Sequence, residues 1–153
     1  TLNTTVIDAI QTMSNSEYIS KLNAVKDELN KGEIFSNERP LQGQSPYIFN
    51  AGINNRLLNK NLEIGLFFNV QGETLSNVGV GGVPDVYAKP FNRLDFSLKK
   101  EFDGKINKTL TLRANNLLND DREQVYKWLG VDTLIFNSYS PGITFSLGYS
   151  IKF

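Results

Sequence analysis

ITFSLGYSIKF, residues 143–153, is the stretch that decides the fold class of this chain. Large apolar residues stand at every second position, with small or polar residues between them. The apolar set is Ile143, Phe145, Leu147, Tyr149, Ile151 and Phe153. Because the side chains of a β-strand point alternately to two faces, this stretch predicts a strand with one apolar face and one polar face.

The same alternation recurs upstream, most clearly in LEIGLFFNV, residues 62–70, where Phe67 alone breaks the pattern. We therefore expect an all-β, antiparallel chain. Its six strands are predicted near residues 1–11, 46–58, 62–73, 91–102, 108–118 and 142–153, and the first of them has the weakest pattern.

Three features favour a segment of a transmembrane β-barrel. The runs reach about ten to twelve residues, whereas soluble strands usually stop near five or six. The connections alternate between long (12–45, 74–90 and 119–141) and short (59–61 and 103–107), as in bacterial barrels with long extracellular loops. The apolar faces of 47–57, 62–70 and 143–153 carry no charged residue. A soluble β domain with one apolar face remains the alternative, because period two alone fits both.

Charged and polar side chains gather on the opposite face of the predicted strands. In a barrel this face lines the lumen, so the candidate lumen-facing residues are Arg56, Arg93, Asp95, Arg113 and Asn115. Cross-strand pairing of opposite charges is the simplest account of Arg93, Asp95 and Arg113. Contact with a substrate or with another part of the protein is the alternative.

The long connections hold three further patterns. Ser14 and Glu17 have the spacing of a capping box, and apolar residues follow at helical spacing to Leu29, so we expect one helix in the first long loop, ended by Gly32. The acidic group at 120–123 matches no calcium-loop spacing and reads as a solvated loop. The glycines at 79–82 lack the lysine of a phosphate-binding loop and indicate loop flexibility.

The composition excludes several classes of function. The chain has no cysteine and no histidine, so the common zinc sites and the Ser–His–Asp and Cys–His catalytic groups are absent. We therefore predict neither an enzyme nor a cofactor. Lys plus Arg balance Asp plus Glu, which indicates no nucleic-acid partner. No apolar run approaches the roughly 20 residues of a transmembrane helix.

A resemblance to a known family rests on several short motifs in a fixed order. They are RPLQGQSPY (39–47), NAG (50–52), PDVY (84–87), NNLLND (115–120), YSPG (139–142) and the Phe-ended last strand. Over roughly 115 residues this chain resembles the C-terminal barrel of TonB-dependent receptors, particularly those of the Bacteroidetes.

The resemblance implies a 22-stranded barrel in the outer membrane of a Gram-negative bacterium, surrounding a plug and importing a scarce nutrient such as a ferric siderophore, cobalamin, a glycan or a peptide. Plug, TonB box and the earlier strands are not in this sequence, so we expect it to be a fragment. Implied partners are the remainder of the receptor, the TonB complex, membrane lipid and a surface lipoprotein. The alternatives are a structural or assembly partner in an outer-membrane complex and a soluble β binding module.

The last strand also resembles the signal that the barrel-assembly machinery recognises. Outer-membrane barrels typically end in Phe preceded by apolar residues at alternate positions, and such a strand can be bound by strand pairing. The matching residues are Phe145, Leu147, Tyr149, Ile151 and Phe153. The same row would face lipid in the finished barrel.

Overall fold

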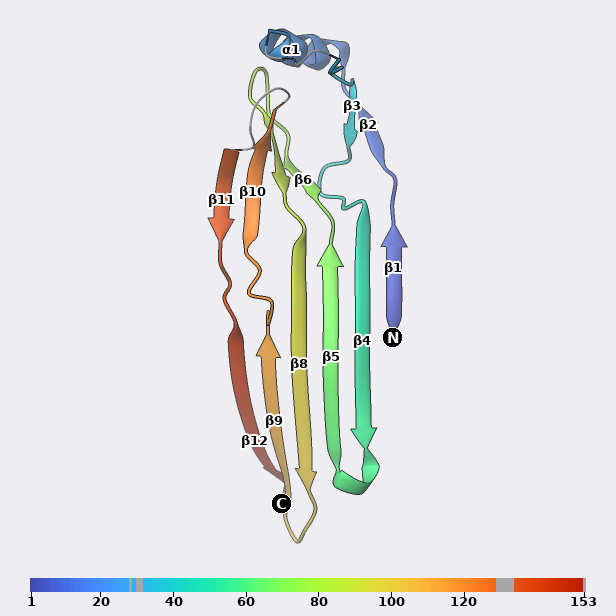
Figure 1. Ribbon diagram of the computed structural model, residues 1–153, viewed down its shortest axis with the longest axis vertical. Coiled ribbons are helices and arrows are strands. Elements are labelled where there is room, and N and C mark those ends of the chain that lie inside the picture. Colours follow the sequence, from blue (N-terminus) through green and yellow to red (C-terminus); the bar gives the residue numbers. More distant parts are fainter. Residues whose placement is uncertain (28, 30–31, 129–133, 153) are drawn as a thin grey trace.

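Six antiparallel strands, five of them nine to twelve residues long, form the body of the molecule. The computed structural model describes residues 1–27, 29, 32–128 and 134–152, and Figure 1 shows these strands side by side along the long axis. The sheet has the order β1-β4-β5-β8-β9-β12. Its strands are β1 (Leu2–Val6), β4 (Tyr47–Leu57), β5 (Leu62–Gln71), β8 (Phe91–Phe102), β9 (Asn107–Asn115) and β12 (Thr144–Lys152). The expected antiparallel β class is confirmed.

Each of the six ranges expected from period two overlaps one of these strands, and β9 begins one residue before its range. The short connections lie together at one end of the sheet (Figure 1). One is the 3-10 turn η1 (Leu58–Lys60), after which Asn61 adopts a positive φ of 46°. Asn tolerates this left-handed conformation better than most residues, which explains its place in a tight turn.

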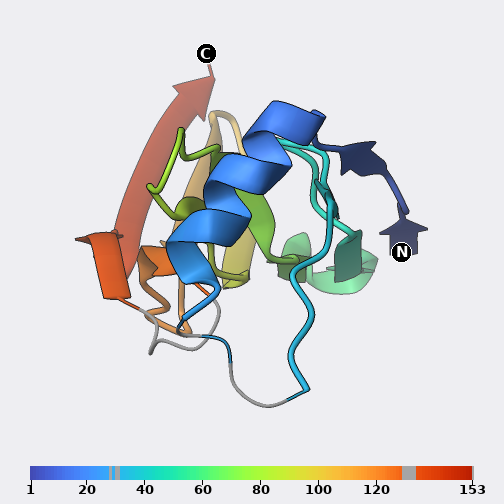
Figure 2. The ribbon, with the colours of Figure 1, turned by 90° about the horizontal axis from the view of Figure 1, so that it is seen from above.

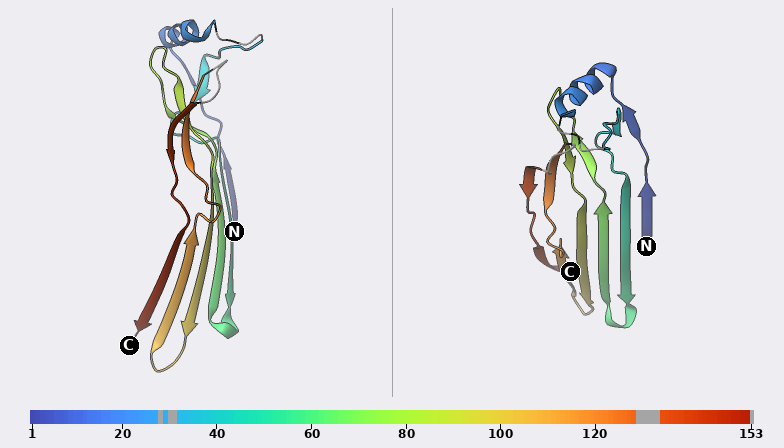
Figure 3. Two further views of the ribbon diagram at one scale, coloured as in Figure 1. Left: turned by 60° about the vertical axis from the view of Figure 1, so that its left-hand side comes forward. Right: turned by 45° about the horizontal axis from the view of Figure 1, so that its top comes forward.

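The long connections are not simple loops, and here the prediction was wrong. They contain β3 (Glu38–Pro40), β6 (Thr74–Asn77), β7 (Asp85–Ala88), β10 (Arg122–Lys127) and β11 (Leu134–Tyr139), and β2 (Ile10–Thr12) leads into the first of them. These strands form a four-stranded sheet, β11-β10-β7-β6, and a two-stranded sheet, β2-β3. Figure 3 shows that they continue the long axis beyond the six-stranded sheet, on the side away from η1.

The four-stranded sheet repeats the strand order of the body. β5 leads into β6, β7 into β8, β9 into β10 and β11 into β12. Four segments of the chain therefore each contribute one strand to both sheets, with a short unpaired stretch between the two strands. Pro90 and Pro141 lie at two of the breaks. Proline has no N–H to donate to a ladder, so the pairing stops there. The expected strand at 1–11 is likewise split: β1 ends at Val6, Ile7 N donates to Pro46 O (2.9 Å), and β2 then pairs with β3 instead of β4.

Buried and partly buried polar side chains hold the breaks in place. Ser45 Oγ donates to the carbonyl oxygens of Tyr47 (2.8 Å) and Gly72 (3.0 Å). Asn116, at φ 55°, donates from Nδ2 to Gly142 O at 3.1 Å. Asp120 Oδ2 accepts from the backbone N of Asn92 at 2.7 Å. Backbone groups that lose their ladder partners are satisfied by these side chains, which keeps the two sheets in a defined relation.

One helix, α1 (Asn15–Val25), lies across the outer end of the molecule, as the view from above shows (Figure 2). Ser14 Oγ accepts from Glu17 N at 3.3 Å, so the predicted N-cap is confirmed. The expected end at Gly32 is wrong, because the helix stops at Val25. No described helix is long and apolar enough to cross a membrane.

Burial is distributed unevenly between the sheets. The buried apolar residues at the outer end are Met13, Val25, Leu75, Val86 and Val125, and the six-stranded sheet contributes only Ala114 among the described residues. In contrast, large apolar side chains of the six-stranded sheet are exposed, and Ile53, Phe145 and Leu147 are each 72% exposed. The outer end has a small core of its own, while the long sheet is one layer thick.

Candidate functional site

The predicted lumen-facing residues share one face of the six-stranded sheet. Register places Arg113 beside Ser97 and Ser146, and Asn115 beside Thr144. A hollow of about 580 Å³ on this face is lined by residues that include Phe67, Asp95, Ser97, Lys99, Arg113 and Asn115. The structure thus brings Asp95, Arg113 and Asn115 together and places Arg93 and Arg56 in neighbouring rows on the same face.

Charge pairing on this face differs from the cross-strand expectation. Arg93 Nε donates to Asp95 Oδ1 at 2.8 Å, within one strand, because residues two apart on a strand point to the same side. Lys99 and Glu101 pair in the same way at 2.5 Å, and Arg56 approaches Glu101 at 3.9 Å. Among the described residues Arg113 forms no ion pair and is exposed. Cross-strand pairing of Arg93, Asp95 and Arg113 was therefore a wrong prediction.

Phe67, the one exception to period two, has a structural explanation. Its ring lies on the polar face above two glycines: a Cβ at Gly52 would stand 2.8 Å from Phe67 Cδ1, and one at Gly65 would stand 2.7 Å from Phe67 Cε2. An aromatic ring over a glycine in a strand covers backbone that would otherwise be exposed to solvent. Phe67 therefore places an aromatic ring on the otherwise polar face of the sheet.

The terminal row lies on the opposite face. Phe145, Leu147, Tyr149 and Ile151 are all exposed, and within the described residues β12 pairs with β9 alone. β12 thus presents a free edge and an open apolar row together. Phe153, the last residue of the predicted assembly signal, lies outside the described residues.

A second hollow, of about 410 Å³, lies at the outer end under α1, and we call it the cap pocket. Its apolar lining is Met13, Val25, Ile34, Phe35, Tyr87 and Trp128. Its charged lining is Lys21, Glu38, Arg39, Asp85 and Lys127, with Ser36 beside them. The volume falls within the range of small-molecule sites, about 300–1,000 Å³, and the mixture of aromatic and polar groups is typical of them.

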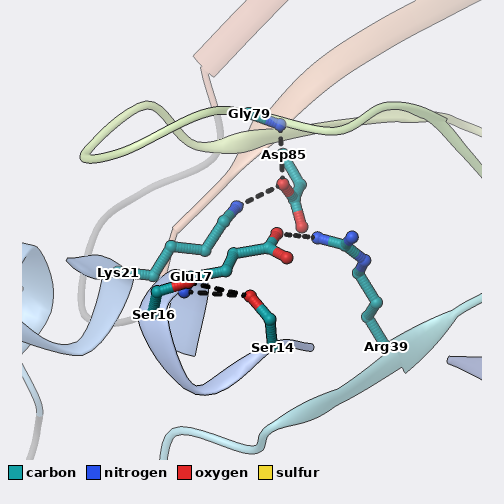
Figure 4. A network of polar contacts seen from close by, with 7 residues as sticks. All are labelled: Ser14, Ser16, Glu17, Lys21, Arg39, Gly79 and Asp85. Carbon is teal, nitrogen blue, oxygen red and sulfur yellow. Dashed lines mark hydrogen bonds and ion pairs between the residues drawn. The ribbon is translucent and has the colours of Figure 1, made fainter. Parts of the chain in front are cut away.

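Two ion pairs join α1 to distant strands at the cap pocket (Figure 4). Lys21 Nζ lies 2.5 Å from Asp85 Oδ1, and their side chains are 4% and 14% exposed. Arg39 Nη1 lies 2.5 Å from Glu17 Oε1. Asp85 Oδ1 also accepts from Gly79 N at 2.8 Å. Buried charges need such partners, because each loses its hydration on burial.

Two groups in the cap pocket have unusual environments. The side chain of Arg39 is 9% exposed, and its Nε has no hydrogen-bond partner on the protein. Burial, together with the negative charges of Asp85 and Glu73, raises the pKa of Tyr87 above its ordinary value of 10.0, against a smaller opposing effect of Arg39. Tyr87 therefore stays neutral throughout the physiological pH range.

Sequence reasoning missed the cap pocket as a site. Glu17 was identified only as a capping residue, yet its carboxylate binds Arg39. The apolar spacing predicted that Leu22 lies on the buried side of the helix. In the structure the buried residues of the helix are Lys21 and Val25. The only sequence signal was Lys21, a basic residue one helical turn after Glu17 in an amphipathic helix. This spacing does not show which distant residue Lys21 contacts.

The acidic group at 120–123 has structural partners. Asp120 accepts from Asn92, and Glu123 Oε2 lies 2.7 Å from Lys89 Nζ. Within the described part of the chain, no group of three or more His, Cys, Asp or Glu residues could hold a metal ion.

Comparison with known proteins gives no match. No protein-family model, no curated protein and no solved structure matches this chain.

Proposed function

We propose that this chain is the C-terminal part of a TonB-dependent outer-membrane receptor, with the six-stranded sheet as barrel wall and the outer end as part of its extracellular surface. The observation that carries the proposal is the single-layered sheet with one exposed apolar face and one polar face. A soluble sheet of this kind would bury its apolar face against a second layer, whereas a barrel wall turns it to lipid.

The distribution of charge along the apolar face supports lipid contact. On β5 the apolar row from Leu62 to Val70 is uncharged and, at about 3.4 Å per residue, extends about 27 Å. At a tilt of about 40° it covers about 21 Å of an apolar band that is about 25 Å tall. Lys100 and Lys108 occur only at the end of this face near the short turns, where long cationic side chains reach the interface.

The two edges of the sheet imply further strands. Among the strands that the structure describes, β1 and β12 each have one neighbour in the sheet. In hydrocarbon each unpaired backbone group costs several kcal/mol, so an open edge does not persist there. In the proposed receptor, earlier strands of a 22-stranded barrel pair with both edges of the sheet. A plug fills the barrel, and the TonB complex is its partner.

The outer end would then face outward and contribute to nutrient recognition. The described residues of all three long connections, 12–45, 74–90 and 119–141, lie at this end, and the short turns lie at the other. The resemblance implies four classes of substrate, which are ferric siderophores, cobalamin, glycans and peptides. Deleting the three segments from the full receptor should weaken nutrient binding, and an unchanged affinity would exclude them from recognition.

A second proposal concerns β12. Its free edge and its exposed row Phe145, Leu147, Tyr149 and Ile151 fit a strand that pairs with the barrel-assembly machinery before the barrel closes. Replacing Tyr149 and Ile151 with Ser should slow membrane insertion, whereas replacing Ser146 and Ser150 with Thr on the polar face should leave it unchanged. Equal insertion of both variants would contradict this role.

Fractionation of native cells tests the main proposal. An antibody against residues 74–90 should detect a polypeptide much larger than 17.2 kDa in the outer membrane, released only by detergent, and loss of TonB should stop uptake of its nutrient. A detergent-free soluble protein would favour the soluble β binding module. A membrane-bound chain of 17.2 kDa would favour the structural or assembly partner in an outer-membrane complex.

A further inference from the structure

We infer that a hollow at the level where the six-stranded and four-stranded sheets meet (Figure 1) is a binding site for a small carboxylate that also carries hydroxyl groups. We call this hollow the arginine groove. It has a volume of about 570 Å³, and its lining includes Gln71, Phe91, Arg122, Gln124, Asn137 and Tyr139. The inference goes beyond the proposed function, because all these residues belong to this chain and the groove can bind a ligand that is not transported.

Arg122 supplies a positive charge that a ligand can reach. The residue is exposed and, within the described residues, forms no ion pair. Its Cζ lies 4.2 Å from the centroid of the Phe91 ring, so the ring supports one flat side of the guanidinium and leaves its N–H edges open. The other two charged residues of the lining, Lys89 and Glu123, pair with each other at 2.7 Å. The described lining therefore carries one positive charge that no carboxylate balances.

A single carboxylate fits this charge best. The planar guanidinium presents parallel N–H groups that match the two oxygens of a carboxylate, and such charge-assisted hydrogen bonds are about twice as strong as neutral ones. A phosphate monoester carries about 1.5 to 2 negative charges near pH 7, so part of its charge would stay unbalanced beside Glu123. A cationic ligand would be repelled by Arg122, because no free carboxylate lines the described part of the groove.

The polar lining favours a ligand with hydroxyl groups. Gln71, Asn137 and Tyr139 line the groove, and within the described residues their side chains make no hydrogen bond to the protein. Amide and phenol groups can both donate and accept, and so can a hydroxyl group of a ligand. Tyr139 is 60% exposed and lies opposite Arg122 in the ladder between β10 and β11. A molecule held at Arg122 by its carboxylate therefore has hydrogen-bonding partners for adjacent hydroxyls.

Four molecules with six carbons each test this selection. Gluconate has a carboxylate and hydroxyls, sorbitol has hydroxyls alone, hexanoate has a carboxylate alone, and glucamine has hydroxyls and a positive charge. Calorimetric titration of the full native polypeptide should show saturable binding of gluconate, at least about tenfold tighter than that of the other three. No saturable binding of gluconate, or equal affinity for any of the other three, would overturn the inference. The titration does not depend on where the polypeptide fractionates, so its outcome is separate from that of the receptor proposal.

Two variants assign the binding to the groove. Arg122→Gln removes the charge and keeps an amide, so gluconate affinity should fall at least about tenfold. The matched control is Arg56→Gln, at an exposed arginine near the other end of the long sheet, and it should leave gluconate affinity unchanged. Asn137→Leu keeps Arg122 and removes an amide, so it should weaken gluconate severalfold, which provides a second test if Arg122→Gln does not fold. An unchanged gluconate affinity in either folded groove variant, or an equal loss in Arg56→Gln, would contradict the inference.

Discussion

Lys21 Nζ and Asp85 Oδ1 lie 2.5 Å apart, although the two residues are 64 positions apart in the chain. The pair links α1 to β7, and both side chains are largely buried. Since the outer end has few buried apolar residues, this contact is a main attachment of the helix to the strands beneath it.

Asp85→Asn should therefore release α1. Leaving one charge of a buried pair without its partner costs about 3–5 kcal/mol. We expect faster hydrogen exchange of the α1 amides, with the six-stranded sheet unchanged. The matched control is Glu123→Gln, which breaks the more exposed pair with Lys89 and should cost about 0–1 kcal/mol. Equal exchange in both variants would show that Lys21 and Asp85 do not hold the helix.

Gly65 should tolerate no side chain. A Cβ there would lie 2.7 Å from Phe67 Cε2 and from Ser97 Oγ, so Gly65→Ala should destabilise the sheet by about 1–3 kcal/mol. Gly148→Ala is the control on the same face, since its Cβ would meet nothing closer than Thr111 Cβ at 3.8 Å. Urea unfolding in detergent measures both. A loss that persists in full when Phe67 is also replaced by Ala would disprove the role of the ring.

The two faces of β4 should respond oppositely to a positive charge. Ile53→Arg places the charge on the apolar face, where an Arg in the bilayer midplane costs about 2–4 kcal/mol. Asn54→Arg places it on the polar face beside Glu63, which already accepts from Asn54 at 2.7 Å. Unfolding in lipid vesicles should show a loss for Ile53→Arg only. Comparable losses for the two variants would argue against lipid contact.

Tyr87 should make the stability of the outer end depend on alkaline pH. Its pKa is raised in the folded chain, first by burial and then by Asp85 and Glu73. The folded state therefore favours the neutral phenol, and this contribution is complete below about pH 10 and is lost as pH rises through the folded pKa. Tyr87→Phe should remove that loss, and Tyr139→Phe, at an exposed tyrosine, should not. Identical alkaline profiles for the parent and Tyr87→Phe would contradict this account.

The long strands could be predicted because each has a uniform face. In β12 every second residue is apolar over the whole described strand, and no charge interrupts the row. Phe67 looked like an error in the pattern, but it follows from the glycines at positions 52 and 65, which leave space for a ring on the polar face. Two of the breaks that end these strands coincide with Pro90 and Pro141, where an N–H is missing.

The short strands and the cap pocket could not be predicted in the same way. Strands β2, β3, β6 and β7 have only three or four residues, too few for an alternation to be recognised, and their pairing depends on the long strands they continue. The pocket depends on contacts between Arg39 and Glu17 and between Lys21 and Asp85. A charged residue in the sequence carries no signal of which distant partner it meets.

Labelling of β8, which has a neighbour on each side, shows whether the apolar face of the sheet contacts lipid. The chain has no cysteine, so single cysteines at Phe96, Ser97, Leu98 and Lys99 can each carry one nitroxide in native outer membranes. Labels at 96 and 98 should be relaxed by oxygen dissolved in lipid, and labels at 97 and 99 by a water-soluble nickel complex. Labels at 96 and 98 that meet the nickel complex, or neither reagent, would place the apolar face against water or protein and contradict the account.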